Sequence, residues 1–175
     1  KRRYQAHPLG YWQDEFPIAA KLGLHYIEFI LDYNDAEQNP LMSDQGVVEL
    51  QKVISETGVN IETICADYFM EAPLHSKNIK IVQKSKAVLS RLLESAHTLG
   101  VKDIVIPCVD QSSLNGKAAE DLFVKNIAPF LDQTEEFNVN LSLETDLAPK
   151  PFAALLARFE SGRITVNYDI GNSAS

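Results

Sequence analysis

One pattern of apolar and polar positions recurs along the chain: an amphipathic helical segment, a turn residue, and then a short apolar run typical of a buried strand. The five repeats read AAKLGLHYIEFIL, ISETGVNIETICA, AHTLGVKDIVIPCV, TEEFNVNLSLE and RFESGRITVNYD. Each predicted helix ends at a residue type that tolerates the left-handed conformation closing a helix (Gly23, Gly58, Gly100, Asn138 and Gly162). The sequence therefore predicts five helix-then-strand units.

Strict alternation of helix and strand predicts parallel strands joined by right-handed crossovers, either in a (β/α)8 barrel or in an open doubly wound sheet. Helix starts are also marked, by Ser43 as an N-cap residue and by Pro149 and Pro151 in the last helix. The glycine-rich turn of dinucleotide folds and the GxxxxGK[ST] loop are both absent. Acidic residues follow the predicted strands (Glu28, Asp32, Asp67, Asp110, Glu144, Asp146 and Asp169). In a barrel these strand ends share the rim where active sites are built, so we favour the barrel.

Composition narrows the class of protein. The 175 residues are 45% hydrophobic and 23% charged, as expected for a single globular domain spanning 1–175. The net charge of -8 argues against a nucleic-acid partner, because phosphate backbones are bound by clustered Lys and Arg. No apolar run approaches the roughly 20 residues of a membrane span, and no signal peptide is recognisable. We expect a cytoplasmic protein in which Cys65 and Cys108 are buried and structural.

Two carboxylates are predicted to meet inside the barrel mouth. In NLSLET the leucines alternate with Ser142 and Glu144, and in the apolar run Arg163–Tyr168 the same alternation, continued one residue, places Asp169 inward. Glu28 likewise faces away from its apolar neighbours. Two inward carboxylates repel one another unless a cation joins them, and oxygen ligands suit Mg²⁺ or Mn²⁺, whereas added imidazoles would favour Zn²⁺, Co²⁺ or Fe²⁺. The alternative, that each acid caps a helix or pairs with a lysine, explains a single acid better than it explains this pair.

The segments LGLHYIEFI, TGVNIETICADY, LGVKDIVI, LSLET and YDIGNSAS, in this order, resemble strands two to six of the xylose isomerase-like barrels. That group includes sugar isomerases and epimerases and the endonuclease IV type of repair enzyme. The resemblance implies that Glu144 and Asp169 are the first two ligands of a divalent metal (Mn, Mg, Co or Zn), with a His and a Glu on later strands completing the site. It also implies that Glu144 moves a proton next to the carbonyl of a sugar or sugar phosphate, through an enediolate.

The chain departs from that family at Asn172, where many relatives have a histidine, so we expect Asn172 to orient substrate or to serve only the turn. Further candidate substrate contacts are Glu28, Tyr68 and His75, although Tyr68 and His75 could equally be packing residues. The chain has four histidines (His7, His25, His75 and His97), and with its negative charge this disfavours the repair-enzyme reading.

Five strands do not close a barrel, which usually needs about 250 residues. We therefore expect a domain truncated at both ends, with unpaired sheet edges that promote self-association and with little turnover by itself. An inosose-type dehydratase on the same scaffold, or a barrel that binds a small polyol or a protein partner without catalysis, remains open.

Overall fold

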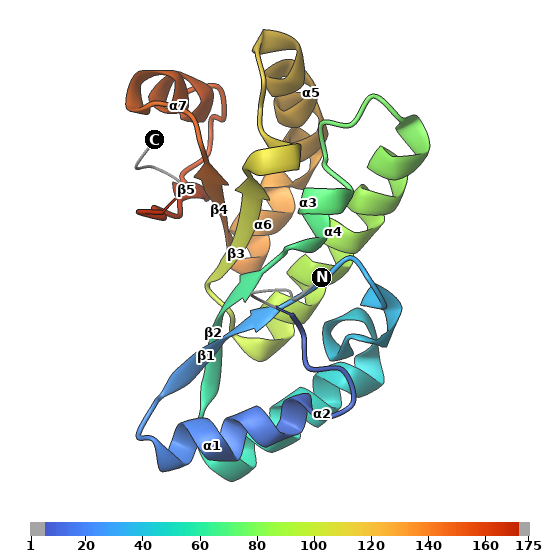
Figure 1. Cartoon of the computed structure of the whole chain (residues 1–175), viewed down its shortest axis with the longest axis vertical. Helices are drawn as coiled ribbons and strands as arrows, with labels where there is room; N and C mark the ends of the chain where they lie inside the picture. The colour runs from blue at the N-terminus through green and yellow to red at the C-terminus, as the bar shows by residue number, and fades with distance from the viewer. Residues whose placement is uncertain (1–5, 172–175) are drawn as a thin grey trace.

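The computed structural model describes residues 6–171, which form a parallel sheet with helices packed against it (Figure 1). The strands are β1 Tyr26–Ile30, β2 Asn60–Cys65, β3 Asp103–Cys108, β4 Asn140–Thr145 and β5 Ile164–Val166. The helices are α1 Glu15–Lys21, α2 Asp44–Thr57, α3 Tyr68–Glu71, α4 Ile79–Leu99, α5 Lys117–Ile127, α6 Leu131–Phe137 and α7 Pro149–Leu156. Short 3-10 turns are η1 Trp12–Asp14, η2 Ala36–Gln38, η3 Pro40–Met42, η4 Asp110–Ser112 and η5 Ala128–Phe130.

The five strands pair in sequence order, β1-β2-β3-β4-β5, and every pair is parallel, as predicted. The β3–β4 pair is regular over six residues, from Asp103 opposite Asn140 to Cys108 opposite Thr145. The β4–β5 pair is shorter, with three pairs from Leu141 opposite Ile164 to Leu143 opposite Val166. Because all five strands are parallel, their C-terminal ends lie at the same edge of the sheet. The structure thus contains five of the eight strands of a barrel.

The two faces of the sheet differ in chemistry. Apolar side chains on one face are buried beneath the helices and form the core, as predicted for Leu141 and Leu143. The buried side chains of the strands are Phe29, Ile61, Ile64, Ile104, Ile106, Leu141, Leu143 and Ile164. The opposite face, which the helices do not cover, carries polar side chains that are partly exposed (Glu28, Thr63, Asp103, Asn140, Glu144 and Thr165). This alternation places the functional candidates on the inner face of the partial barrel.

Most predicted helix ends are confirmed. Ser43 caps α2 by accepting a hydrogen bond from the Gly46 amide at 3.1 Å, and Gly58 and Asn138 adopt left-handed conformations after α2 and α6. The prediction for Gly162 is wrong: α7 ends at Leu156, and Gly162 lies in a later turn outside the left-handed region. Phe159, in the segment between α7 and Gly162, is buried and packs against Phe123, at 6.3 Å between ring centroids.

The last strand is shorter than its apolar run suggested. β5 covers only Ile164–Val166, and Tyr168, at 72% exposure, lies beyond it. Among the described residues, β5 has a partner strand on one side only, so its end is not held from both sides. No described helix combines the length and the apolarity needed to cross a bilayer.

Candidate functional site

Polar side chains on the inner face bond to one another from strand to strand. The Thr63 hydroxyl on β2 donates to Glu28 Oε2 on β1 at 2.8 Å. On the other half of the sheet, the Ser142 hydroxyl donates to Asp103 Oδ1 at 2.7 Å and shares a hydrogen bond with Thr165 at 2.6 Å. The inner face is therefore an ordered polar surface, because each of these groups is held by a neighbour one strand away.

Glu144 lies at the C-terminal end of β4 on this inner face, where the alternation of leucines predicted it. Its Oε2 accepts a hydrogen bond at 2.9 Å from the side-chain amide of Asn167, which directly follows β5. The backbone amide of Asn167 in turn donates to the carbonyl of Leu143 at 2.9 Å and so prolongs the β4–β5 pairing. The alternation that directs Asp169 inward also places Asn167, two residues earlier, on the inner face, but the sequence does not predict its hydrogen bond to Glu144.

Asp169 lies two residues beyond Asn167 and is exposed to solvent. Its Oδ1 accepts a hydrogen bond from the backbone amide of Gly171 at 2.5 Å, which closes a tight turn after the strand. Asn172, the third candidate of this segment, lies outside the described residues. The proposed pairing of Glu144 with Asp169 through a metal stays a prediction.

The buried thiol of Cys65 lies at the end of β2. Burial raises the pKa of the Cys65 thiol strongly, and the negative charges of Asp67, Glu28 and Glu144 raise it further. Its sulfur donates a hydrogen bond to Asp67 Oδ1 at 3.2 Å. Cys65 and Cys108 are free and buried, as predicted.

Tyr68 is a core residue in this structure. It begins α3, its ring is fully buried, and it packs against Tyr33 at 5.2 Å and Phe69 at 5.6 Å between centroids. Its buried hydroxyl has no hydrogen-bond partner among the described residues, and desolvation raises its pKa. A ligand could reach this hydroxyl only after neighbouring side chains move.

His75 lies in the loop before α4, with its ring edge-on to Phe123 of α5 at 6.3 Å. Its Nδ1 is buried without a partner in the described part of the chain. Burial lowers the pKa of His75, while a backbone hydrogen bond with Ser113 acts in the opposite direction. The Ser113 hydroxyl donates to Asp146, which follows β4, so this cluster lies at the same edge of the sheet as Glu144.

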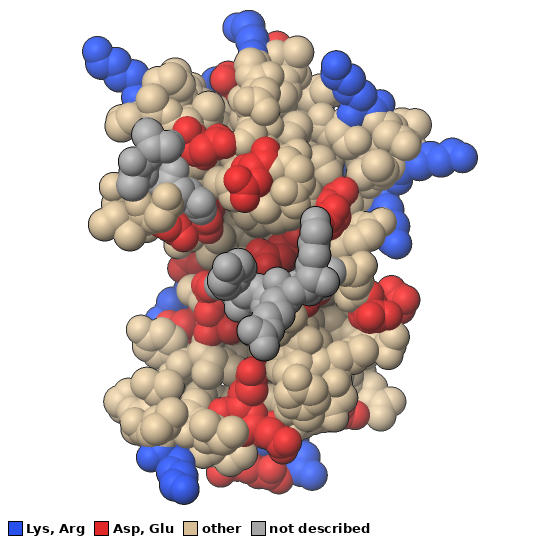
Figure 2. Space-filling view, viewed as in Figure 1, with Lys and Arg blue, Asp and Glu red and all other residues tan. Residues whose placement is uncertain are grey.

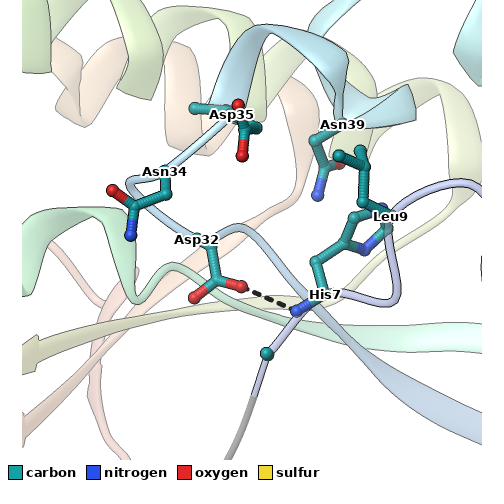
Figure 3. A pocket seen from close by; sticks show the side chains of 8 residues that line it. His7, Leu9, Asp32, Asn34, Asp35 and Asn39 are labelled. Carbon is teal, nitrogen blue, oxygen red and sulfur yellow. Dashed lines mark hydrogen bonds between the residues drawn. The ribbon is translucent and has the colours of Figure 1, made fainter. Parts of the chain in front are cut away.

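A small polar cavity follows β1. The His7 amide donates to Asp32 Oδ2 at 2.7 Å, and Asn34, Asp35 and Asn39 surround the same space of about 100 Å³ (Figure 3). A larger and more apolar groove of about 430 Å³ lies between α7 and the end of the sheet, lined by the chain's 145–149 and 166–168 segments and by α7 residues. Sequence reasoning predicted neither feature, since both depend on how separate segments meet.

Acidic and basic side chains lie on different parts of the surface. Figure 2 shows Asp and Glu side chains across the middle of this face, whereas most Lys and Arg side chains lie towards its outer ends. Several of the cations form ion pairs with acidic side chains, as in the pairs of Lys102 with Glu62 at 2.5 Å and of Arg163 with Glu135 at 3.0 Å. The middle of this face therefore carries mainly acidic side chains, which suit a cation.

The described residues supply some of the donor atoms that a metal site needs. Carboxylate oxygens such as those of Glu144 and Asp169 are the donors that Mg²⁺ and Mn²⁺ prefer. Within residues 6–171, no group of three or more His, Cys, Asp or Glu side chains is arranged to hold a metal ion. Two carboxylates are too few for a six-coordinate ion, so any complete site needs further ligands from outside this range or from solvent.

Comparison with known proteins connects these features to relatives. A putative L-ribulose-5-phosphate 3-epimerase of Haemophilus influenzae is 24% identical over 175 residues, covering 92% of this chain and 59% of that protein. A magnesium complex of a xylose isomerase-like TIM barrel protein from Mycobacterium smegmatis superposes with a TM-score of 0.70 at 18% identity, over 94% of this chain and 58% of that one. For D-psicose 3-epimerase of Clostridium cellulolyticum H10, solved with D-tagatose, the TM-score is 0.69 at 19% identity, over 89% and 56%.

The chain therefore spans between 56% and 59% of the length of these relatives. At such low identities the two structures establish the fold alone, and they agree with the partial barrel seen here. The model of one family, described as the xylose isomerase-like TIM barrel, matches residues 16–174, which is nearly the whole chain. This chain belongs to the xylose isomerase-like TIM barrel family.

Proposed function

We propose that this chain is part of a metal-dependent isomerase or epimerase that acts on a ketose or a ketose phosphate. The observation that carries the proposal is the position of Glu144, on the inner face at the C-terminal end of β4, with Asn167 bonded to its carboxylate. In barrels this rim is where catalytic groups gather. Relatives that carry epimerase names support the reaction class.

Glu144 and Asp169 are the residues that would hold the metal, with the remaining ligands outside residues 6–171. Their oxygens favour Mg²⁺ or Mn²⁺ over Co²⁺ or Zn²⁺. A divalent ion bound there supplies positive charge that polarises the carbonyl oxygen of a ketose. The acidic side chains in the middle of the face in Figure 2 support this assignment, because they attract a cation and repel a polyanion such as nucleic acid.

Glu144 is also the residue that would accept the proton from the carbon next to the carbonyl. A carboxylate can do this only if its oxygen is directed at the reacting hydrogen, which requires a fixed side chain. Epimerisation needs a second group, outside residues 6–171, to deliver a proton to the opposite face of that carbon. Glu28 on β1, already bonded to Thr63, would accept hydrogen bonds from sugar hydroxyls at the inner face. Tyr68, His75 and Asn172 remain proposed substrate contacts, and Tyr68 needs its neighbours to move first.

The test separates metal binding from turnover. Exchange of the proton at carbon 3 with ²H₂O is followed by NMR for D-psicose, D-fructose, D-tagatose and L-ribulose 5-phosphate, with Mn²⁺ present, on the longest natural protein that contains this chain. We expect exchange with at least one ketose and a loss of about 100-fold or more in Glu144→Gln. Glu62→Gln, the same change at a carboxylate paired with Lys102, is the matched control and leaves exchange unchanged.

The same assay, run also with an inosose as substrate, distinguishes the alternatives. Loss of water from the inosose would instead identify a dehydratase. Sugar binding without exchange, unaffected by Glu144→Gln, would identify a non-catalytic polyol-binding barrel. Either result would overturn the epimerase proposal.

A further inference from the structure

Asn167 occupies a position that two separate contacts determine. Its backbone amide bonds to the carbonyl of Leu143, which fixes the chain against β4 one residue beyond the last strand pair. Its side chain then points to the inner face, where Nδ2 lies 2.9 Å from Glu144 Oε2. The backbone hydrogen bond to Leu143 therefore orients the Asn167 side chain, and the side-chain amide restrains the Glu144 carboxylate.

The chemistry of this contact is specific to an amide. A glutamate side chain has three rotatable bonds, so its carboxylate can take many orientations. A hydrogen bond donated to one carboxylate oxygen restricts these rotations and fixes the orientation. An aspartate at position 167 would place a second negative charge beside Glu144 Oε2, and an apolar residue would offer no hydrogen-bond donor. A bond to an ionised acceptor is also stronger than one between neutral groups.

We propose that Asn167 is a positioning residue, which sets the direction of the Glu144 carboxylate for metal binding and for proton transfer. The inference rests on the proposed function, since it takes Glu144 as a ligand and base. Asn167 acts through Glu144 and itself moves no proton. Partners that orient a metal ligand in this way commonly change metal affinity by about 10-fold to 100-fold when they are removed.

A purely structural role for Asn167 makes a different prediction, and Thr165 provides the comparison. Thr165 lies two residues earlier on the same face and bonds to Ser142 at 2.6 Å, a contact of similar kind that does not involve Glu144. If the inner-face hydrogen bonds only stabilise the sheet, Thr165→Val and Asn167→Leu have similar consequences. If Asn167 positions Glu144, only Asn167→Leu changes metal binding.

The experiment titrates the longest natural protein that contains this chain with Mn²⁺ alone and follows paramagnetic line broadening by NMR, which detects even millimolar binding. We expect Asn167→Leu to weaken Mn²⁺ binding by about 10-fold or more, with Thr165→Val unchanged. Asn167→Ser, whose hydroxyl is too short to reach Glu144, introduces no bulk and should show the same loss; urea unfolding confirms that each variant is folded. In the Glu144→Gln background, Asn167→Leu should have no further effect.

Each outcome is decisive. If Glu144→Gln abolishes Mn²⁺ binding while Asn167→Leu and Asn167→Ser both bind as the original chain does, the positioning role is wrong and the proposed function stands. Equal losses in Thr165→Val and Asn167→Leu would also overturn the positioning role. If Mn²⁺ causes no broadening near Glu144, or if Glu144→Gln binds normally, the metal site itself is wrong and the inference about Asn167 falls with it.

Discussion

A methyl group at Gly46 would lie 2.3 Å from the carbonyl oxygen of Pro40, so helix α2 and the turn η3 meet backbone against backbone. No side chain could yield at this contact. Both segments are on the outside of the sheet, where η3 also accepts hydrogen bonds from α4: the Ser95 hydroxyl donates to the carbonyl of Leu41 at 2.7 Å. At Gly46 the outer layer therefore has no room for a side chain.

Gly46→Ala is expected to destabilise the protein, although alanine is the better helix former. Helix propensity favours Ala by about 1 kcal/mol, but the clash with the Pro40 backbone forces α2 outward, at a cost of about 1–3 kcal/mol or more. Urea unfolding should give a net loss of stability. Gly162→Ala is the control, with no heavy atom within 4 Å of the added carbon, and should stay within about 0.5 kcal/mol. A stabilised Gly46→Ala variant would contradict the packing of η3 on α2.

Tyr68→Phe should leave the free energy of unfolding unchanged or raise it by up to about 1 kcal/mol. The Tyr68 hydroxyl is buried and has no partner among the described residues, so its removal ends an uncompensated loss of hydration. Tyr168→Phe, at an exposed tyrosine, serves as control. Chemical denaturation measures both. A loss above about 1 kcal/mol for Tyr68→Phe would show that the hydroxyl has a partner in solution, such as an ordered water.

Stability should decline in alkaline solution because of the two buried thiols. Burial raises the pKa of Cys65 and Cys108 above the ordinary value of 9.0. Each folded thiol therefore keeps its proton where the unfolded one loses it, so the stabilisation is complete below pH 9.0 and falls as pH rises, by about 1.4 kcal/mol per unit and thiol. Urea midpoints from pH 7 to 10 measure the slope. The Cys65→Ala/Cys108→Ala double variant should show a shallower slope, and an identical slope would assign the effect elsewhere.

The 175-residue chain is expected to self-associate. Among residues 6–171 the outer sides of β1 and β5 pair with no strand, and large apolar side chains near them are exposed, including Tyr26 and Ile170. Sedimentation velocity should reveal association that grows with concentration. Val166→Lys, on β5, should reduce it, whereas Val48→Lys, at an exposed valine of α2, should not. A monomer at every concentration would refute the edge argument.

The fold was largely predictable because its signals are local. Turn residues such as Gly58 and Asn138 act through their own backbone conformation, and the alternation in NLSLET reports directly which side of β4 meets the helices. The prediction failed at Gly162 because α7 already ends at Leu156 and Gly162 lies outside the left-handed region. A glycine in the sequence indicates where a left-handed residue is allowed and not where the tertiary structure needs one.

The candidate site was predictable in direction but not in detail. Alternation placed Glu144 on the inner face, yet the bond from Asn167 depends on the reach of two side chains across 23 positions of sequence. Tyr68 was expected at the mouth because it follows a strand, and the structure buries it beneath Tyr33 and Phe69. What covers a strand end is determined by loops, whose conformation no periodic pattern reports.

Only three residue pairs join β5 to β4. The orientation of Glu144 therefore depends on the shortest strand of the sheet. Asn167 keeps its orientation only while β5 stays paired with β4. Local unfolding of β5 would release Glu144 and leave the six residue pairs between β3 and β4 intact. The amides of β5 and Asn167 should therefore exchange their hydrogens with solvent sooner than those of β3. A ligand that bridges Glu144 to groups beyond β5 would slow this exchange, so binding and the folding of the final unit would be one equilibrium.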